Sequence, residues 1–274
     1  MDITPEMVRS LREQTGLPMM ECKKALVEAA GEMPKAVDIL RRAGSAKISK
    51  LSGRETSQGR IACWVDPSGQ KAGIVQLVCE TAPVASTDDF IMLARMCAEV
   101  AAGMAQPTVE AVRAAPAPGR PGQTIDALWL EMANRVRENM SIKRVAALTG
   151  HVAQYVHHNA QVGVVIAMSA ECPVELRVDL CMHIAALNPP FLRREDVDPA
   201  LVQIERERAA GEAKGKPPQI VEKIVSGKLD RWYGEVALLE QPFVKDDKLA
   251  VKAVLQAAVP NLTVSKFVRY SVGG

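Results

Sequence analysis

The chain has 274 residues, a formal net charge of +2 and an aromatic content of only 4%. This length allows more than one domain and a sizeable core, which must be built mainly from aliphatic side chains. The balanced charge argues against a nucleic-acid-binding protein and against attraction to an anionic membrane.

Residues 1–45 are predicted to form a small module of three short helices. The Thr4-Pro5 pair supplies a cap and a first turn, and Gly16 can adopt the left-handed conformation that closes the first helix. The second helix is expected from about Met19 to Ala30, and the third from near Pro34 to Gly44. A module of this size has a marginal core, so its conspicuous exposed residues favour a role in binding.

Two adjacent methionines, Met19 and Met20, begin the second helix and are followed by Lys23 and Lys24. Neighbouring side chains on a helix cannot both point into one small core. We therefore expect at least one of the two methionines at the surface, where the flexible thioether suits a surface that adapts to a partner.

Residues 46–59 are polar, show no sustained apolar period and are interpreted as a linker. The apolar period then changes to two, which predicts strands at Arg60–Val65 and Gly73–Cys79 joined by a turn at 66–69. A helix capped by Thr87 is expected to follow and to end at about residue 103.

The order strand, turn, strand and helix recurs later in the chain. Strands are predicted at His151–Tyr155 and Val162–Met168, followed by a helix at about Val174–Ala186. The recurrence indicates two related α+β subdomains, residues 60–148 and 149–274, each with an antiparallel sheet covered by helices.

The remaining segments are mostly helical. Between the two copies, helices are expected at 108–115 and 123–137, separated by the surface loop APAPGRPG. The chain is expected to finish with a helix near 249–257 and a strand at 264–271.

A pair of helices, 200–210 and 219–230, follows the Asp198-Pro199 cap and is connected by the turn sequence GKPP. Helices joined by so short a turn form an antiparallel hairpin, which we expect within about residues 198–231. The run of charges on the first of these helices, taken alone, indicates only a solvated face.

The sequence contains no recognisable catalytic or cofactor motif. It has no P-loop, no dinucleotide-binding fingerprint and no evident set of nucleophile, base and acid. The adjacent His157 and His158 are poorly placed for joint metal binding, and His183 lies among apolar helix residues, where a buried and hydrogen-bonded histidine is the usual outcome. We therefore expect no enzyme activity, no metal and no cofactor.

The six cysteines form no CxxC pair, and their spacing matches neither a zinc site nor a secreted disulfide framework. The start, MDITPEMVRS, lacks the basic and apolar regions of a signal peptide, and no apolar run reaches the roughly 18 residues that a membrane span needs. We expect reduced, mostly buried thiols in a cytoplasmic protein.

The stretch LREQTGLPMMECKKAL, Leu11–Leu26, closely resembles the N-terminal signature of the bacterial translation elongation factor Ts family. The pattern LR..TG..MM.CKKAL is matched at every fixed position. NMSIKRVAAL at 139–148 and WYGEVALLEQPFV at 232–244 resemble later segments of the same family. The resemblance implies an α+β fold with a ubiquitin-associated-like (UBA-like) N-terminal module, a duplicated core and a projecting coiled-coil hairpin.

The resemblance also implies a partner and a function. Members of this family bind elongation factor Tu and promote release of its GDP by distorting the nucleotide and Mg²⁺ site. A factor that prefers the nucleotide-free partner must weaken GDP binding by the same coupling factor. No nucleic-acid or membrane partner is implied, and the residues expected to bind elongation factor Tu are Arg12, Met19, Met20, Lys23, Thr81, Ala82, Pro83, Val84, His158 and Gly163.

Two segments depart from the family pattern. In ETAPVA, Ala82 and Pro83 stand where the family's Thr-Asp-Phe-Val motif has Asp and Phe, and beside His158 the residues Asn159 and Gln161 replace a Gly and an Arg. Ala carries no charge, and Pro offers only a small rigid ring without an N–H. Binding is therefore expected to survive better than nucleotide exchange.

Two alternatives are open at this point. One is a relative that binds and holds elongation factor Tu without efficient exchange, which an exchange assay distinguishes. The other is a UBA-like adaptor for an unrelated partner, which a pull-down that lacks elongation factor Tu would support. The matches in the core and the hairpin weigh against the second.

Overall fold

The N-terminal module consists of three helices, as predicted. The computed structural model describes residues 3–273, and its first helices are α1 (Pro5–Thr15), α2 (Met19–Glu28) and α3 (Met33–Ser49). The Thr4 hydroxyl accepts a hydrogen bond from the Met7 N–H at 3.2 Å, and Gly16 ends α1 in the left-handed conformation. Leu11 and Leu26 are fully buried in the module's own apolar cluster.

The predicted end of the third helix at Gly44 is wrong, because α3 continues to Ser49. Gly44 faces helix α7 (Ile125–Val136), and a Cβ atom at this position would lie 1.8 Å from the side-chain nitrogen of Asn134. The glycine therefore permits close approach of two helices and does not mark a helix end. The first residues of the predicted linker are helical as a result, while the domain boundaries themselves stay a prediction.

Two three-stranded antiparallel sheets form the centre of the molecule. The first has the order β1-β2-β3 and the second has the order β4-β5-β8. In each sheet the second strand of a hairpin is central and a third strand pairs with its free edge, so the predicted recurrence is present in the topology. The strands are β1 (Gln58–Val65), β2 (Lys71–Cys79), β3 (Met140–Thr149), β4 (His151–Val156), β5 (Val162–Met168) and β8 (Val264–Ser271).

The two sheets pack face to face, with helices on their outer faces. Ile61, Ile74 and Val165 belong to one apolar cluster between the sheets. The outer face of the first sheet packs against α5 (Asp88–Ala102) and α7, and that of the second against α8 (Val174–Leu187). Helices on one face of each sheet were predicted; the contact between the sheets was not, although both faces of β2 and β5 are apolar and must be covered.

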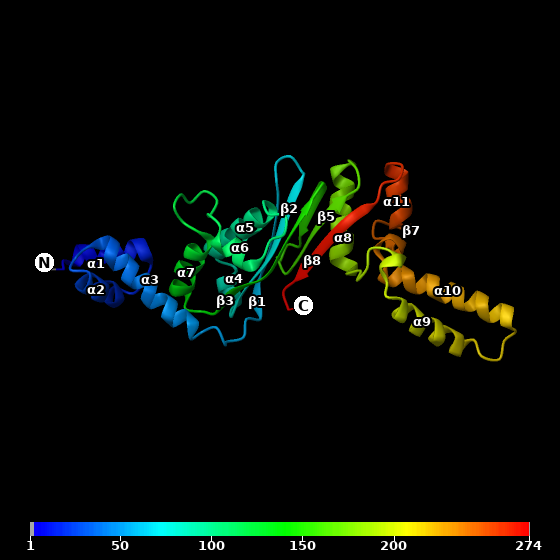
Figure 1. The fold of residues 1–274 in the computed structure, drawn as a ribbon, viewed down its shortest axis with the longest axis horizontal. Helices are drawn as coiled ribbons and strands as arrows, with labels where there is room; N and C mark the ends of the chain where they lie inside the picture. The colour runs from blue at the N-terminus through cyan, green and yellow to red at the C-terminus, as the bar shows by residue number, and fades with distance from the viewer. Residues whose placement is uncertain (1–2, 274) are drawn as a thin grey trace.

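A helical hairpin projects from the end of the molecule opposite the N-terminal module (Figure 1). Its helices, α9 (Pro199–Glu212) and α10 (Pro218–Val236), pack through Ala209, Val225 and Leu229. α10 runs past its predicted end at Asp230, because Trp232 and Tyr233 continue the apolar face that meets α9. The hairpin itself is confirmed.

The base of the hairpin is held by Arg194. Its guanidinium lies 2.6 Å from a carboxylate oxygen of Asp230 and 2.8 Å from one of Glu240, and it covers the Tyr233 ring at 4.7 Å from the centroid. One side chain thus connects both ends of the hairpin region to the body of the protein.

Several short elements complete the fold, and α4, β6 and β7 were not predicted. None of the helices described in residues 3–273 is long and apolar enough to cross a membrane. The remaining elements are α4 (Ala82–Ala85), α6 (Val109–Ala114), the 3₁₀ turns η1 (Arg194–Asp196) and η2 (Leu238–Glu240), β6 (Pro242–Phe243), β7 (Asp246–Ala250) and α11 (Val251–Ala258).

We predict that Gly163→Ala lowers the stability of the whole core. A Cβ atom at Gly163 would lie 2.4 Å from the Cγ2 methyl of Ile61 on the facing sheet, and that methyl is fully buried. Overpacking of this kind costs about 1–3 kcal/mol, measured as the loss in unfolding free energy in urea.

The matched second variant adds Ile61→Leu to Gly163→Ala. Leucine is not branched at Cβ, so it lacks the Cγ2 methyl that the new Cβ atom would meet. This second change should recover part of the lost stability. A Gly163→Ala variant as stable as the starting protein would contradict the close packing of the sheets.

Candidate partner-binding surfaces

The first candidate surface lies on α2. Met19 is 40% exposed and Met20 is 64% exposed, which confirms the expectation that at least one of them reaches the surface. Cys22 and Leu26 on the same helix are buried, so α2 presents its opposite face to solvent. Lys23 is exposed on this helix.

Val27 extends the α2 surface and was missed by the sequence analysis. Its side chain is 60% exposed and lies two turns after Met20, on the same face of the helix. The helical spacing of Met20, Lys23 and Val27 was the available signal. Arg12, near the end of α1, is exposed as well, and neither Arg12 nor Lys23 forms an ion pair within the part of the chain that the structure describes.

The second candidate surface is the short helix α4, which carries the segment that departs from the family motif. Ala82 and Pro83 are exposed, Val84 is partly buried, and Ala85 anchors the turn in the core. The Ala85 N–H donates to the Thr81 carbonyl at 3.3 Å, and Arg60 donates to the Ala85 carbonyl at 3.4 Å. Positions 82 and 83 therefore protrude from a turn whose far end is fixed to the core.

Besides the bond from Ala85, three further hydrogen bonds hold Thr81 at the start of α4. Its N–H and its hydroxyl donate to the two carboxylate oxygens of Glu138, at 3.0 and 2.6 Å. Its carbonyl accepts a hydrogen bond from the Cys79 thiol at 3.2 Å. Burial and the neighbouring Glu138 carboxylate raise the pKa of Cys79 to about 11, so the thiol keeps its proton and remains a donor at neutral pH.

The third candidate surface is the turn between β4 and β5. His158 is exposed, and its ring lies 4.2 Å from that of His157, measured between centroids. His157 is fixed by a hydrogen bond of 3.0 Å between its Nδ1 atom and the Tyr155 hydroxyl. The Asn159 side chain accepts the Gln161 N–H at 3.0 Å, which closes the turn.

The start of β1 joins the second and third surfaces. The Ile61 N–H donates to the Ala160 carbonyl at 2.8 Å, and the Gln161 side chain donates to the Gly59 carbonyl at 3.0 Å. Arg60, between them, makes the bond to α4 described above. The structure thus brings the Thr81–Val84 segment and the histidine turn to the same strand.

Gly163 is placed differently from the other expected partner-binding residues. It is buried on the inner face of β5 against Ile61, so its requirement for glycine has a packing reason. Its contact with a partner stays a prediction.

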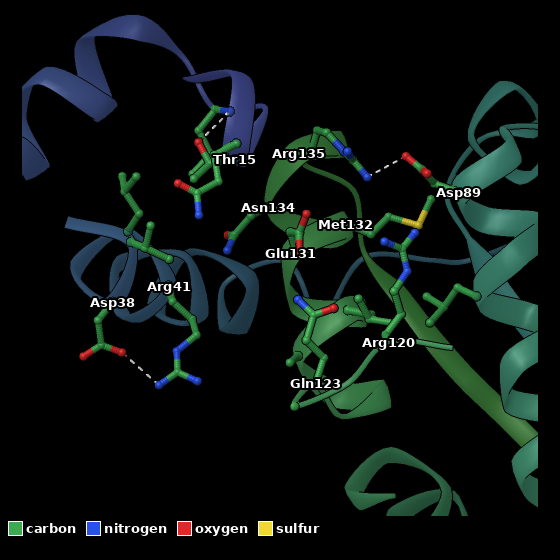
Figure 2. A pocket seen from close by; sticks show the side chains of 18 of the residues that line it. Thr15, Asp38, Arg41, Asp89, Arg120, Gln123, Glu131, Met132, Asn134 and Arg135 are labelled. Atoms are coloured by element: carbon green, nitrogen blue, oxygen red, sulfur yellow. Dashed lines mark hydrogen bonds and ion pairs between the residues drawn. The ribbon is translucent and has the colours of Figure 1, made fainter. Parts of the chain in front are cut away.

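A pocket of about 760 Å³ lies between the N-terminal module and the core and is lined by residues of both. Figure 2 shows Asp38 and Arg41 of α3 on one side and Asp89 and Arg120 of the core on the other. An ion pair of 2.6 Å between Asp89 and Arg135 crosses the core side of the pocket. The module contacts the core mainly through α3, where Gly44 packs against Asn134 and Ile48 joins the core's apolar cluster, and through the ion pair between Glu21 and Arg137.

The histidines and cysteines form no metal-binding group within the described residues. No group of three or more His, Cys, Asp or Glu side chains within residues 3–273 is placed to hold a metal ion. The expected structural role of His183 is confirmed, because its ring is buried, lies 2.9 Å from the Gln241 side-chain oxygen and accepts the Val244 N–H. All six cysteines are free, and all but Cys63 are buried.

Comparisons with known proteins agree with this architecture. The family model described as elongation factor TS matches residues 80–274. Proteins named elongation factor Ts from Azoarcus sp. and Aromatoleum aromaticum are 41% and 39% identical over 99% of this chain and 91% of their own length. The corresponding protein from Methylococcus capsulatus is 40% identical over 100% of this chain and 93% of its own. The chain belongs to the elongation factor Ts family.

Proposed function

We propose that this protein binds elongation factor Tu and promotes the release of its GDP, without covalent chemistry and without a cofactor. The observation that carries the proposal is the similarity to elongation factor Ts proteins along nearly the whole chain, combined with the exposure of the signature methionines. The site of action would be the cytoplasm, with no nucleic-acid or membrane partner.

Affinity is assigned mainly to the α2 surface. Met19, Met20 and Val27 offer exposed apolar area, and Arg12 and Lys23 add charges that are free to pair with a partner. A few apolar side chains near the centre of such a surface carry most of the binding free energy. The flexible methionines suit a partner whose conformation changes with its nucleotide.

Exchange is assigned to the core, through α4 and His158. A protein that binds nucleotide-free elongation factor Tu more tightly than the GDP complex lowers the affinity for GDP by the same factor. The α4 turn offers only the methyl of Ala82 and the ring of Pro83 at its exposed positions. Without a carboxylate or an aromatic ring there, the core is expected to distort the nucleotide site weakly.

A relative that holds elongation factor Tu without efficient exchange is the second candidate. The same two residues, Ala82 and Pro83, favour it. The two candidates share the binding surface and differ only in the coupling between this protein and GDP.

The test of the proposed function is release of a fluorescent GDP analogue from the cognate elongation factor Tu, with this protein in catalytic amounts. We expect the release rate to rise with the concentration of this protein and to saturate. A stable complex without any acceleration would favour the holding function. Absence of a complex would reject both candidates.

Restoring the family residues should strengthen exchange. Both positions are exposed, so Ala82→Asp combined with Pro83→Phe fits without repacking the core. We expect the maximum rate of GDP release to rise about tenfold, which corresponds to ~1.4 kcal/mol of added transition-state stabilisation. The single change Ala82→Asp separates the charge from the ring, and an unchanged rate in the double variant would contradict the role given to α4.

Met20→Ala should weaken the complex without destabilising the protein. The side chain is 64% exposed, so its truncation leaves the module's core intact. We expect a loss of about 1–3 kcal/mol in binding free energy by titration calorimetry and an unchanged melting temperature. Leu187→Ala, at a residue 47% exposed on α8, is the matched control and should leave the affinity unchanged.

A further inference from the structure

The end of the β2–β3 ladder shows an unusual pair of hydrogen bonds. The last backbone pair of the ladder joins Cys79 to Met140, and beyond it the two chains diverge into α4 and α7. At this point Thr81 donates its N–H to the Glu138 carboxylate at 3.0 Å, and Asn139 donates its N–H to the Glu80 carboxylate at 2.6 Å. Two glutamates thus replace the backbone carbonyls that a continued ladder would supply.

The same corner connects to the segment that leads into the core. The Asn139 side chain, only 9% exposed, donates to the carbonyls of Ser52 and Arg54 at 3.4 and 2.6 Å. Arg54 in turn lies 3.5 Å from a carboxylate oxygen of Glu80. Hydrogen bonds from Asn139 to Glu80, Ser52 and Arg54 therefore fix the backbone at residues 138–139.

The α4 turn depends on this corner because its first residue is fixed by a group outside the helix. α4 has four residues, and Thr81 at its N-cap makes no side-chain capping bond to the helix. The Thr81 hydroxyl donates to Glu138 instead, at 2.6 Å. Charged acceptors give the stronger hydrogen bonds, so the carboxylate fixes the N-cap residue itself and thereby orients the turn.

We propose that Glu138 is a positioning residue for nucleotide exchange, which fixes the direction in which Ala82 and Pro83 protrude toward the partner. This proposal rests on the proposed function and assigns a role to a residue outside the expected binding set. Glu138 acts through Thr81 and needs no contact with the partner itself.

The neighbouring Arg137 provides a contrast within the same corner. Arg137 adopts a left-handed conformation at the end of α7, and its guanidinium lies 3.1 Å from the Glu21 carboxylate on α2. Its side chain is 60% exposed, and exposed ion pairs contribute little free energy. The position of the module relative to the core should therefore depend on Arg137 much less than the orientation of α4 depends on Glu138.

The experiment measures the maximum rate of GDP release and, separately, the concentration that gives half of that rate. For Glu138→Ala we expect the maximum rate to fall about tenfold, because the charge-assisted hydrogen bonds that orient α4 are lost. The half-saturating concentration should change less than about threefold, because the α2 surface is intact. Glu138→Gln keeps the shape and one acceptor and should restore part of the rate. Arg137→Ala should stay within about threefold of the starting protein in both quantities.

Glu110→Gln is the matched control for removing a carboxylate. Glu110 is exposed at the start of α6 and has no hydrogen bond or ion pair with the residues that the structure describes. It should leave both quantities unchanged. An equal loss in the maximum rate for Glu110→Gln and Glu138→Gln, or a Glu138→Ala variant with the rate of the starting protein, would overturn the proposal.

A double-mutant cycle shows whether Glu138 acts through Thr81. Thr81→Val removes the hydroxyl and keeps the N–H and the branched shape. If Glu138 positions α4 through this residue, the combined Glu138→Ala and Thr81→Val variant should lose less than the sum of the two single losses in free energy. Strict additivity would count against the proposed route.

A measurement on the free protein keeps this proposal separate from the proposed function. Hydrogen exchange at the Ala85 amide, which closes α4 onto Thr81, should be about tenfold faster in Glu138→Ala, because opening of the turn costs less. This readout does not need elongation factor Tu. Unchanged exchange at Ala85 would reject the positioning role even if the protein binds and releases its partner as proposed.

Discussion

The contact between the two sheets is the constraint on which the rest of the molecule depends. β1 and β5 approach so closely that Gly163 has no room for a side chain against Ile61. Because the inner faces are closed by this contact, each sheet needs helices on one face only. The N-terminal module and the helical hairpin can then be carried at opposite ends of the sandwich without covering either sheet (Figure 1).

The same contact determines the positions of the two core segments that are proposed to meet the partner. β1 pairs with β2 along its whole length, and its first residues also bind the turn that follows β4. The α4 turn continues from the end of β2, so it emerges beside the turn that carries His158. Two segments that are far apart in the sequence are therefore held on one strand, through Arg60 on one side and the backbone of Gly59 and Ile61 on the other.

Local patterns predicted most of the elements, and tertiary contacts explain the errors. Thr4, Gly16 and Thr87 have their predicted capping roles because those roles depend on a few neighbouring residues. Gly44 was interpreted as a helix end because the side chain it accommodates, Asn134, comes from a distant helix. For the same reason Glu138 gave no signal: a glutamate in a polar segment looks solvated until the fold places Thr81 against it. The exposed methionines could be anticipated, since a small module leaves little room for them inside.

The proposed separation of a surface for affinity from a surface for exchange would allow the family motif to change in one of them. This protein binds nucleotide-free and GDP-bound elongation factor Tu with two different free energies. In a linkage mechanism, exchange depends on the difference between these two free energies, whereas affinity also depends on the contribution that is common to both. The α2 surface contributes to the common part if its partner segment does not change with the nucleotide. Under the proposed function, the absence of a charge and a ring at α4 is then expected to reduce the difference and to leave most of the affinity. A rigidly oriented α4 is still needed, because even a small side chain can discriminate between two states of a partner only if it is held in one place.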